Sequence, residues 1–396
     1  MPDRREAWIT GIGLVSSLGE GVDAHYEALA SGAGPKVDET RFAPYPVHPM
    51  APLDLDKQIP KRGDQRQMEP WQRYGTYTAG LALESAGIKG NTEILSRTHM
   101  IVAAGGGERD NSVDIKILDG LRTAGNKGQF LNERLMGDLR PTLFLAQLSN
   151  LLAGNISIVH GVVGSSRTFM GEEASGVDAV RIALSRLHGG TGDIFLVGGA
   201  FNAEREDMLL LFELGGALMH GAYAPVWERA AGGGGLALGS MAAFLVLEEK
   251  AHAEARAAKP FARLASVQSG RSRRNAGDVA AAVTSHLDAL GPLDPASSAI
   301  LSGAVGAETA TSEERAALAG RGLPVRATAS LIGAGIESQF PVNIALAAIA
   351  LSKGKLFAPF GADAIEAPFA GPLKQVAVTS VGHWRGEAAA LVEAVD

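Results

Sequence analysis

Short apolar runs rich in valine and isoleucine recur along the whole chain, and helical patterns separate them. Their hydrophobicity is continuous rather than alternating, which is typical of strands that are covered on both faces. Strands and helices in alternation predict an α/β fold, with helices packed on mainly parallel sheets. The runs that we expect to form strands are 7–15, 100–106, 193–200, 244–249, 299–305 and 375–381.

The segments between these runs carry two clear helical patterns. Residues 174–187 place their apolar side chains on one stripe, and residues 344–354 are apolar nearly all round, as in a buried helix. The proline-rich stretch from about 38 to 75 is typical of an irregular surface excursion.

Composition excludes several classes of function. The chain has 396 residues, 46% of them hydrophobic, enough for one large two-part globule or two domains. Its net charge of −7 and scattered basic residues argue against a nucleic-acid partner. It contains no cysteine, which excludes disulfides and thiol nucleophiles. No signal peptide and no bilayer-spanning run are evident, so we expect a soluble, cytoplasmic protein with no membrane partner.

The glycine and histidine patterns do not indicate a cofactor or a metal. The G-x-G of residues 10–19 has Ser16 at the third glycine position, and GGGG at 232–235 lacks the Lys-Ser/Thr of a phosphate loop. No two histidines have metal-ligand spacing with an acid nearby. We therefore expect neither a cofactor nor a metal site.

The order of segments resembles the β-ketoacyl-acyl carrier protein synthases of the thiolase-fold, or condensing-enzyme, family. The resemblance implies a thiolase-like five-layer αβαβα fold of two related halves, residues 1–250 with surface insertions and residues 251–396. Such proteins normally dimerise through central strands, and 193–200 resembles the interface strand. The matching segments are ITGIGLVSSLGEG (9–21), NLLAGNISIVHGVVGSS (150–166), GDIFLVGGA (192–200) and APVWERAAGGGGLALGSMAAFLVLEEKAHAEARAAKP (224–260).

The positions that correspond to the family's catalytic residues are all exchanged. In the family, a cysteine at a helix start is acylated and two histidines stabilise the enolate formed from the malonyl group. Here Glu173 stands at the cysteine, Gly303 and Ala334 stand at the two histidines, and His383 stands near the gating phenylalanine. In the same motifs Ala329 replaces a lysine, Thr311 replaces an aspartate and Glu314 is kept. The resemblance therefore implies a chain that is inactive alone.

Glu173 has two interpretations. The simpler one is that Glu172 or Glu173 caps the helix that follows or fills space. The other is a contact with His383, either as an ion pair or as a pair able to act as acid and base.

Two classes of function follow, with a third beside them. The first is a non-condensing subunit of fatty acid elongation (very-long-chain acids included) or polyketide elongation, similar to chain-length factors, paired with an active β-ketoacyl synthase. The second is a decarboxylase or hydrolase of acyl-carrier thioesters that uses Glu173 and His383. The third is a stand-alone acyl-binding homodimer.

Residues 61–75 resemble the family segment whose basic residues face the acyl carrier protein. Arg62 and Arg66 are kept there, whereas Gly63 and Gln67 stand at two other basic positions. We therefore expect weak docking of an acyl carrier protein at Arg62 and Arg66, the alternative being a solvated helix start.

Overall fold

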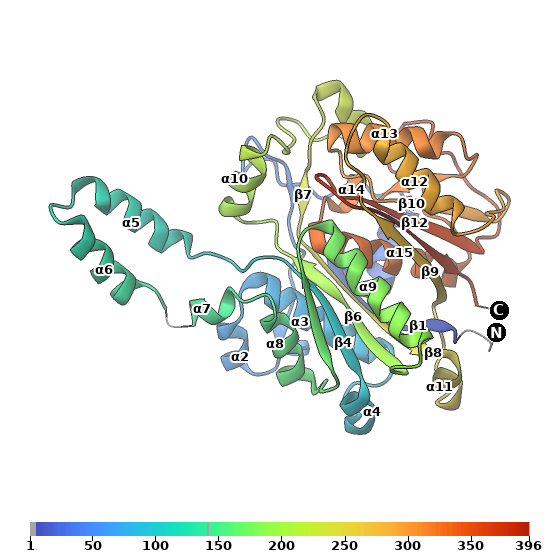
Figure 1. Ribbon diagram of the computed structural model, residues 1–396, viewed down its shortest axis with the longest axis horizontal. Coiled ribbons are helices and arrows are strands. Elements are labelled where there is room, and N and C mark those ends of the chain that lie inside the picture. Colours follow the sequence, from blue (N-terminus) through green and yellow to red (C-terminus); the bar gives the residue numbers. More distant parts are fainter. Residues whose placement is uncertain (1–4, 141, 396) are drawn as a thin grey trace.

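A long mixed sheet runs through the computed structural model, which describes residues 5–140 and 142–395 (Figure 1). Its strand order is β11-β10-β12-β13-β9-β1-β8-β6-β4-β5, with β2 paired to β1, and β3 and β7 form a separate pair. The strands are β1 (Ala7–Ser16), β2 (Gly19–Glu20), β3 (Val47–His48), β4 (His99–Ala104), β5 (Ser166–Met170), β6 (Ile194–Phe201), β7 (Leu238–Gly239), β8 (Met241–Glu249), β9 (Ala262–Gly270), β10 (Ser298–Ser302), β11 (Val325–Ala327), β12 (Gln375–Val381) and β13 (Glu387–Glu393).

Helices lie on both faces of this sheet and between its two halves. The α-helices are α1 (Gly21–Ala30), α2 (Arg62–Gln67), α3 (Pro70–Ser85), α4 (Thr92–Arg97), α5 (Asn111–Thr123), α6 (Lys127–Asp138), α7 (Leu143–Ala146), α8 (Leu151–His160), α9 (Glu173–His188), α10 (Glu206–Leu214), α11 (Lys250–Ala255), α12 (Asp278–Asp288), α13 (Glu308–Ala319), α14 (Ala329–Ile332) and α15 (Gln339–Lys353). Short 3₁₀ helices are η1 (Leu55–Lys57), η2 (Val226–Gly232) and η3 (Ile336–Ser338).

The elements stack in the order helix, strand, helix, strand, helix. α3 and α8 contact β1, β4, β5, β6 and β8 on one side, and α12 and α13 contact β12 on the other. α9 and α15 lie between the two halves and contact strands of both (Figure 1). Every residue from Gln339 to Leu351 in α15 is buried, which explains why this helix is apolar nearly all round. The predicted helices at 174–187 and 344–354 are thus present as α9 and α15. The division of the chain at residue 250 stays a proposal.

Three expectations about the elements were wrong. The sheet is mixed rather than mainly parallel, because β1, β6, β9, β12 and β13 each have an antiparallel partner. β6, expected at an interface edge, lies between β4 and β8 and is buried throughout. The strand at that end of the sheet is β5. The stretch 38–75 is not irregular throughout, since it contains α2 and the first turns of α3.

The pair of helices α5 and α6 projects away from the body of the molecule (Figure 1). The two helices pack against each other. Several of their large apolar side chains are nevertheless exposed, namely Ile115, Leu118, Leu131, Leu135 and Met136. We call residues 111–138 the arm. Within the described residues, no helix is long and apolar enough to cross a bilayer.

Candidate functional site

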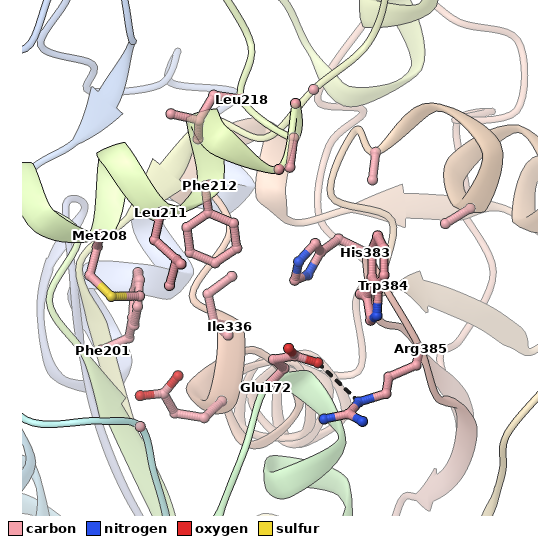
Figure 2. Close-up of a pocket in the computed structure, with 18 of the residues that line it drawn as sticks. Glu172, Phe201, Met208, Leu211, Phe212, Leu218, Ile336, His383, Trp384 and Arg385 are labelled. Atoms are coloured by element: carbon pink, nitrogen blue, oxygen red, sulfur yellow. Dashed lines mark hydrogen bonds and ion pairs between the residues drawn. The ribbon is translucent and has the colours of Figure 1, made fainter.

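A cavity of about 1170 Å³ opens where the N-terminus of α9 meets α10, η3 and the loop between β12 and β13. One wall of it is apolar and comes from the end of β6, from α10 and from η3. Opposite this wall lie Glu172 and the loop residues 383–385 (Figure 2). The apolar side chains are Phe201, Met208, Leu211, Phe212, Leu218 and Ile336. A concave site with one apolar wall and a few polar groups suits a small organic ligand.

Glu173 and His383 form a hydrogen-bonded pair beside this cavity. The His383 Nδ1 lies 2.8 Å from the Glu173 Oε1, and the backbone N–H of His383 donates to the same oxygen at 3.0 Å. Glu173 is 3% exposed, and its Oε2 is buried without a partner among the described residues. The imidazole lines the cavity and meets the ring of Phe212 edge-on at 5.1 Å between centroids (Figure 2). The contact between Glu173 and His383 that the sequence suggested is therefore present.

Each member of the pair favours the charged form of the other. Burial opposes the charged form of both groups, but the hydrogen bond and charge of His383 hold the pKa of Glu173 below its ordinary value. In the same way, burial is outweighed by Glu173, which raises the pKa of His383. The first turn of a helix also favours a carboxylate. Since Nδ1 faces Glu173, Nε2 is the nitrogen that can exchange a proton with a ligand.

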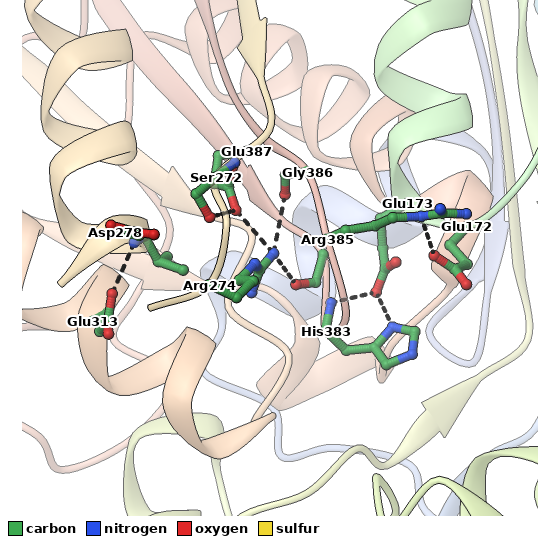
Figure 3. A network of polar contacts seen from close by, with 12 residues as sticks. Glu172, Glu173, Ser272, Arg274, Asp278, Glu313, His383, Arg385, Gly386 and Glu387 are labelled. Atoms are coloured by element: carbon green, nitrogen blue, oxygen red, sulfur yellow. Dashed lines mark hydrogen bonds and ion pairs between the residues drawn. The ribbon is translucent and has the colours of Figure 1, made fainter. Parts of the chain in front are cut away.

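Glu172 does not cap α9 as expected. It is the N-cap residue, but its side chain makes no cap hydrogen bond. It accepts instead from Arg385, with Nε and Oε2 3.2 Å apart (Figure 3). The short loop 382–386 between β12 and β13 brings Arg385 to α9, a contact that local sequence cannot reveal.

The loop that carries His383 is held from its other side by Arg274. Its guanidinium donates to the carbonyl oxygen of Gly382 at 2.8 Å and pairs with Glu387 at 3.0 Å. Ser272 donates to the same carboxylate through its backbone N–H and its hydroxyl (Figure 3). These bonds fix the loop and thereby the orientation of the imidazole.

Gly303 and Ala334 bring no polar side chain to the site, and neither is among the described residues that line the cavity. A Cβ at Gly303 would lie 2.5 Å from the carbonyl oxygen of Thr379 and 2.6 Å from the Cα of Ser380, so there is no room for a side chain. Ala334 is buried, and its backbone is bonded to Ala237 and Gly239.

The neighbouring motif positions serve the scaffold. Glu314 is fully buried and accepts from Ser302 at 2.8 Å, and burial raises its pKa to about 6. Thr311 accepts from the backbone N–H of Gly306. Ala329 is buried at the start of α14.

The inner wall of the cavity carries a carboxyl group that the sequence did not single out. Glu337 in η3 lines the cavity although it is only 5% exposed. A Cβ on Gly105 would lie 2.6 Å from its Oε1, and a Cβ on Gly176 of α9 would lie 2.4 Å from its carbonyl oxygen. Two glycines therefore allow η3 to fit between β4 and α9. Burial raises the pKa of Glu337 to about 8, so the carboxyl is largely protonated at neutral pH.

Arg62 and Arg66 lie together on α2 and do not line the cavity. The Arg62 side chain is 82% exposed, with Asp56 at 3.9 Å as a weak ion pair, and Arg66 is exposed. Carrier docking at these residues stays a proposal. No group of three or more His, Asp or Glu side chains that could hold a metal ion occurs within residues 5–140 and 142–395.

Comparison with known proteins identifies the family. Residues 5–253 match the beta-ketoacyl synthase N-terminal domain. The chain belongs to the beta-ketoacyl synthase family. Its relatives include 3-oxoacyl-[acyl-carrier-protein] synthase 2 of Vibrio cholerae, 27% identical over 269 residues that make up 65% of this chain and 61% of the relative. The corresponding synthase of Rhizobium meliloti is 28% identical, over 65% of this chain and 62% of the relative. The matched part thus spans about three-fifths of these synthases.

Solved structures confirm the fold of this synthase family member. The ishigamide ketosynthase/chain length factor superposes with a TM-score of 0.79 at 20% identity, covering 99% of this chain and 100% of that one. A beta-ketoacyl synthase from Burkholderia phymatum gives a TM-score of 0.76 at 21% identity, with 99% and 100% covered. The expected thiolase-like ketosynthase fold is therefore confirmed.

Proposed function

We propose that the chain is a non-condensing, chain-length-factor-like subunit that pairs with a catalytically complete β-ketoacyl synthase in fatty acid or polyketide elongation. The observation that carries this proposal is the Glu173–His383 ion pair at the N-terminus of α9. A carboxylate that is buried, ionised and bonded twice to one residue is a poor nucleophile toward a thioester.

The rest of the site supports the absence of condensation. An enolate needs donors aimed at its oxygen, and each such donor contributes on the order of 10²–10³ in rate. Gly303 and Ala334 supply none, and a side chain at Gly303 would collide with the backbone of β12. Glu173 thus occupies the position of the nucleophile, and Gly303 and Ala334 leave the positions of the two donors without a polar side chain.

The surface supports association with another chain. β5 pairs with β4 on one side, and its other edge has no partner among the described strands. Beside this edge the apolar side chains of Ile158, Val163 and Met170 are exposed, at 73%, 62% and 72%. The arm presents further apolar side chains. Unpaired edges and apolar patches of this kind favour association. One structural relative is itself described as a ketosynthase/chain length factor.

The test is a condensation assay with acyl- and malonyl-carrier substrates, run on the pure chain and on the chain co-expressed with an active synthase of the same genome. We expect no β-ketoacyl product from the chain alone. With the partner, we expect product whose chain length changes when this subunit is varied. Carbon–carbon bond formation by the pure chain would refute the proposal.

A second candidate function has one observation in its favour. Glu173 orients His383 so that Nε2 is left for a ligand in the cavity, as in carboxylate–histidine pairs that work as general acid or base. Such a pair suits hydrolysis or decarboxylation of an acyl-carrier thioester. Under this alternative, the pure chain would release free acid or carbon dioxide from the thioester, and His383→Gln would abolish the release.

A further inference from the structure

We propose that Glu337 and His383 act as two hydrogen-bond donors inside the cavity that select acyl chains bearing a second carbonyl oxygen, beyond that of the acyl group itself. The inference rests on the proposed function only for the class of ligand, an acyl chain. The inference gives a subunit that does not condense a role in binding acyl chains. It assigns part of that role to Glu337, which is not the residue that stands at the position of the family's cysteine.

The apolar wall of the cavity suits the alkyl part of an acyl chain. Phe201, Met208, Leu211, Phe212 and Leu218 line a space of about 1170 Å³, large enough for an extended alkyl segment. Figure 2 shows Leu211 and Phe212 on the side of the cavity that faces the loop with His383 and Trp384. A chain without polar atoms would offer no partner to the buried carboxyl of Glu337 or to the Nε2 of His383, which is costly.

Glu337 has no side-chain hydrogen bond among those found in the described residues, although backbone N–H groups of Gly105 and of Glu337 itself bond to its carboxyl. On the inner wall, Asn202 donates to Glu108 at 3.1 Å, and Arg205 donates to Asp207 at 2.5 Å and to the carbonyl oxygen of Gly107 at 3.1 Å. Within the described residues, Glu337 has no ion pair. Its carboxyl lies against Gly105, where a side chain would exclude it.

The charges around Glu337 favour a neutral ligand over an anionic one. The charged groups that act on its carboxyl are Arg205 and Glu173. Arg205 is neutralised by Asp207, and Glu173 by His383. Neither of the two charges beside Glu337 is therefore free for a ligand carboxylate. A protonated Glu337 carboxyl is a donor, and Nε2–H of His383 is a second donor in the charged form of the imidazole that Glu173 favours; a carbonyl oxygen is a neutral acceptor that matches them.

The test measures binding of hydrolysis-resistant amide analogues by calorimetry: 3-oxooctanoyl-pantetheine, octanoyl-pantetheine and pantetheine alone. The full chain is used, alone or co-purified with its synthase, since the substitutions lie in this chain only. We expect the 3-oxo analogue to bind about tenfold more tightly than the saturated one at pH 7. Because the Glu337 pKa is about 8, we expect that preference to fall about tenfold between pH 7 and pH 9.

Two substitutions separate a ligand contact from a packing effect. Glu337→Leu should bind both acyl analogues equally. Glu337→Gln keeps a donor that cannot ionise, so it should retain the preference at pH 9, and any remaining pH dependence would belong to His383. Glu308→Gln, at the exposed rim of the cavity, is the control and should behave as the wild type.

The outcomes are distinct from those that test the proposed function. Retention of the preference by a folded Glu337→Leu variant would overturn this inference, and so would equal binding of both analogues, or of neither, by the wild type. A chain that shows the preference and also condenses alone would overturn the proposed function while leaving this inference intact.

Discussion

At the scale of single residues, the hydrogen-bonded pair of Glu173 and His383 sets the charge and the hydrogen-bonding groups at one side of the cavity. We predict that Glu173→Gln lowers the pKa of His383 and destabilises the fold by about 2 kcal/mol near pH 5.5, because a charged hydrogen bond is replaced by a neutral one. The histidine pKa can be measured by NMR titration. The control is Glu308→Gln, which should leave that pKa unchanged.

The pH dependence of this loss follows from the two shifts. Glu173 has a pKa below its ordinary 4.5, so its contribution is present above 4.5 and is lost as the pH falls through the lowered value. His383 has a pKa above its ordinary 6.5, so its contribution is complete below 6.5 and is lost as the pH rises through the raised value. The stability difference between wild type and Glu173→Gln should therefore be largest between these limits and shrink at alkaline pH. A difference in urea unfolding that keeps growing as the pH rises above 6.5 would contradict the ion pair.

We also predict that Glu173→Cys alone does not restore condensation. The new thiol would stand at the helix N-terminus, but Gly303 and Ala334 would still leave the enolate without donors. The measurement is product formation from acyl- and malonyl-carrier substrates, with mass spectrometry to show whether the cysteine is acylated. Recovery of condensation by this one change would mean that the donors come from other residues.

The sequence could predict those contacts of the site that join two recognisable motifs, but not those made by residues outside such motifs. The alignment of short motifs brought Glu173 and His383 to one place, because both lie in segments that resemble the family. Arg385 and Glu337 were missed. The partner of Arg385 is 213 residues away in sequence. Nothing local distinguishes Glu337 from an exposed acid, since its burial results from the packing of η3 between Gly105 and Gly176.

At the scale of elements, the sequence predicted which segments form strands better than it predicted which strands lie next to each other in the sheet. A continuous apolar run indicates a strand covered on both faces, and β6 is such a strand, but this says nothing of which strands flank it. The sequence did not predict the edge strand β5, because three of its five residues, SRTFM, are polar and the strand therefore lacks a continuous apolar run. An edge strand is one that has a neighbouring strand on one side only, and this can be seen only in the three-dimensional structure.

We predict that the β5 edge and the adjoining surface of α8 mediate association. Ile158→Asp and Met170→Asp introduce charges into exposed apolar surface beside that edge, and each should weaken association about tenfold or more without lowering the melting temperature. Leu214→Asp is the matched control, because Leu214 is 79% exposed but belongs to a different element, α10. Sedimentation velocity of the complex measures the effect. Equal weakening by the control would contradict an interface at β5.

At the scale of the whole molecule, a ketosynthase-type fold is formed by a chain that contains no cysteine. A self-dimer would cover the β5 edge and the arm as well as a heterodimer would, so exposed surface alone does not choose between them. The choice rests on the chemistry: two copies of this chain contain no cysteine and no donor at Gly303 or Ala334, whereas a synthase partner supplies a complete site.

We therefore predict that co-expression with an active synthase of the same genome yields a complex with one copy of each chain, in which the 41.0-kDa subunit is present once. Native mass spectrometry gives the stoichiometry. Because the arm projects from the body with its apolar side chains exposed, Leu118→Asp and Met136→Asp should lower the yield of this complex but not the folding of the chain. Ala316→Asp, at an exposed position of α13 toward the other end of the sheet from β5, serves as the control and should leave the yield unchanged. A monomer, or a homodimer that ignores every such synthase and still binds acyl chains, would refute the subunit role and favour a stand-alone acyl-binding protein.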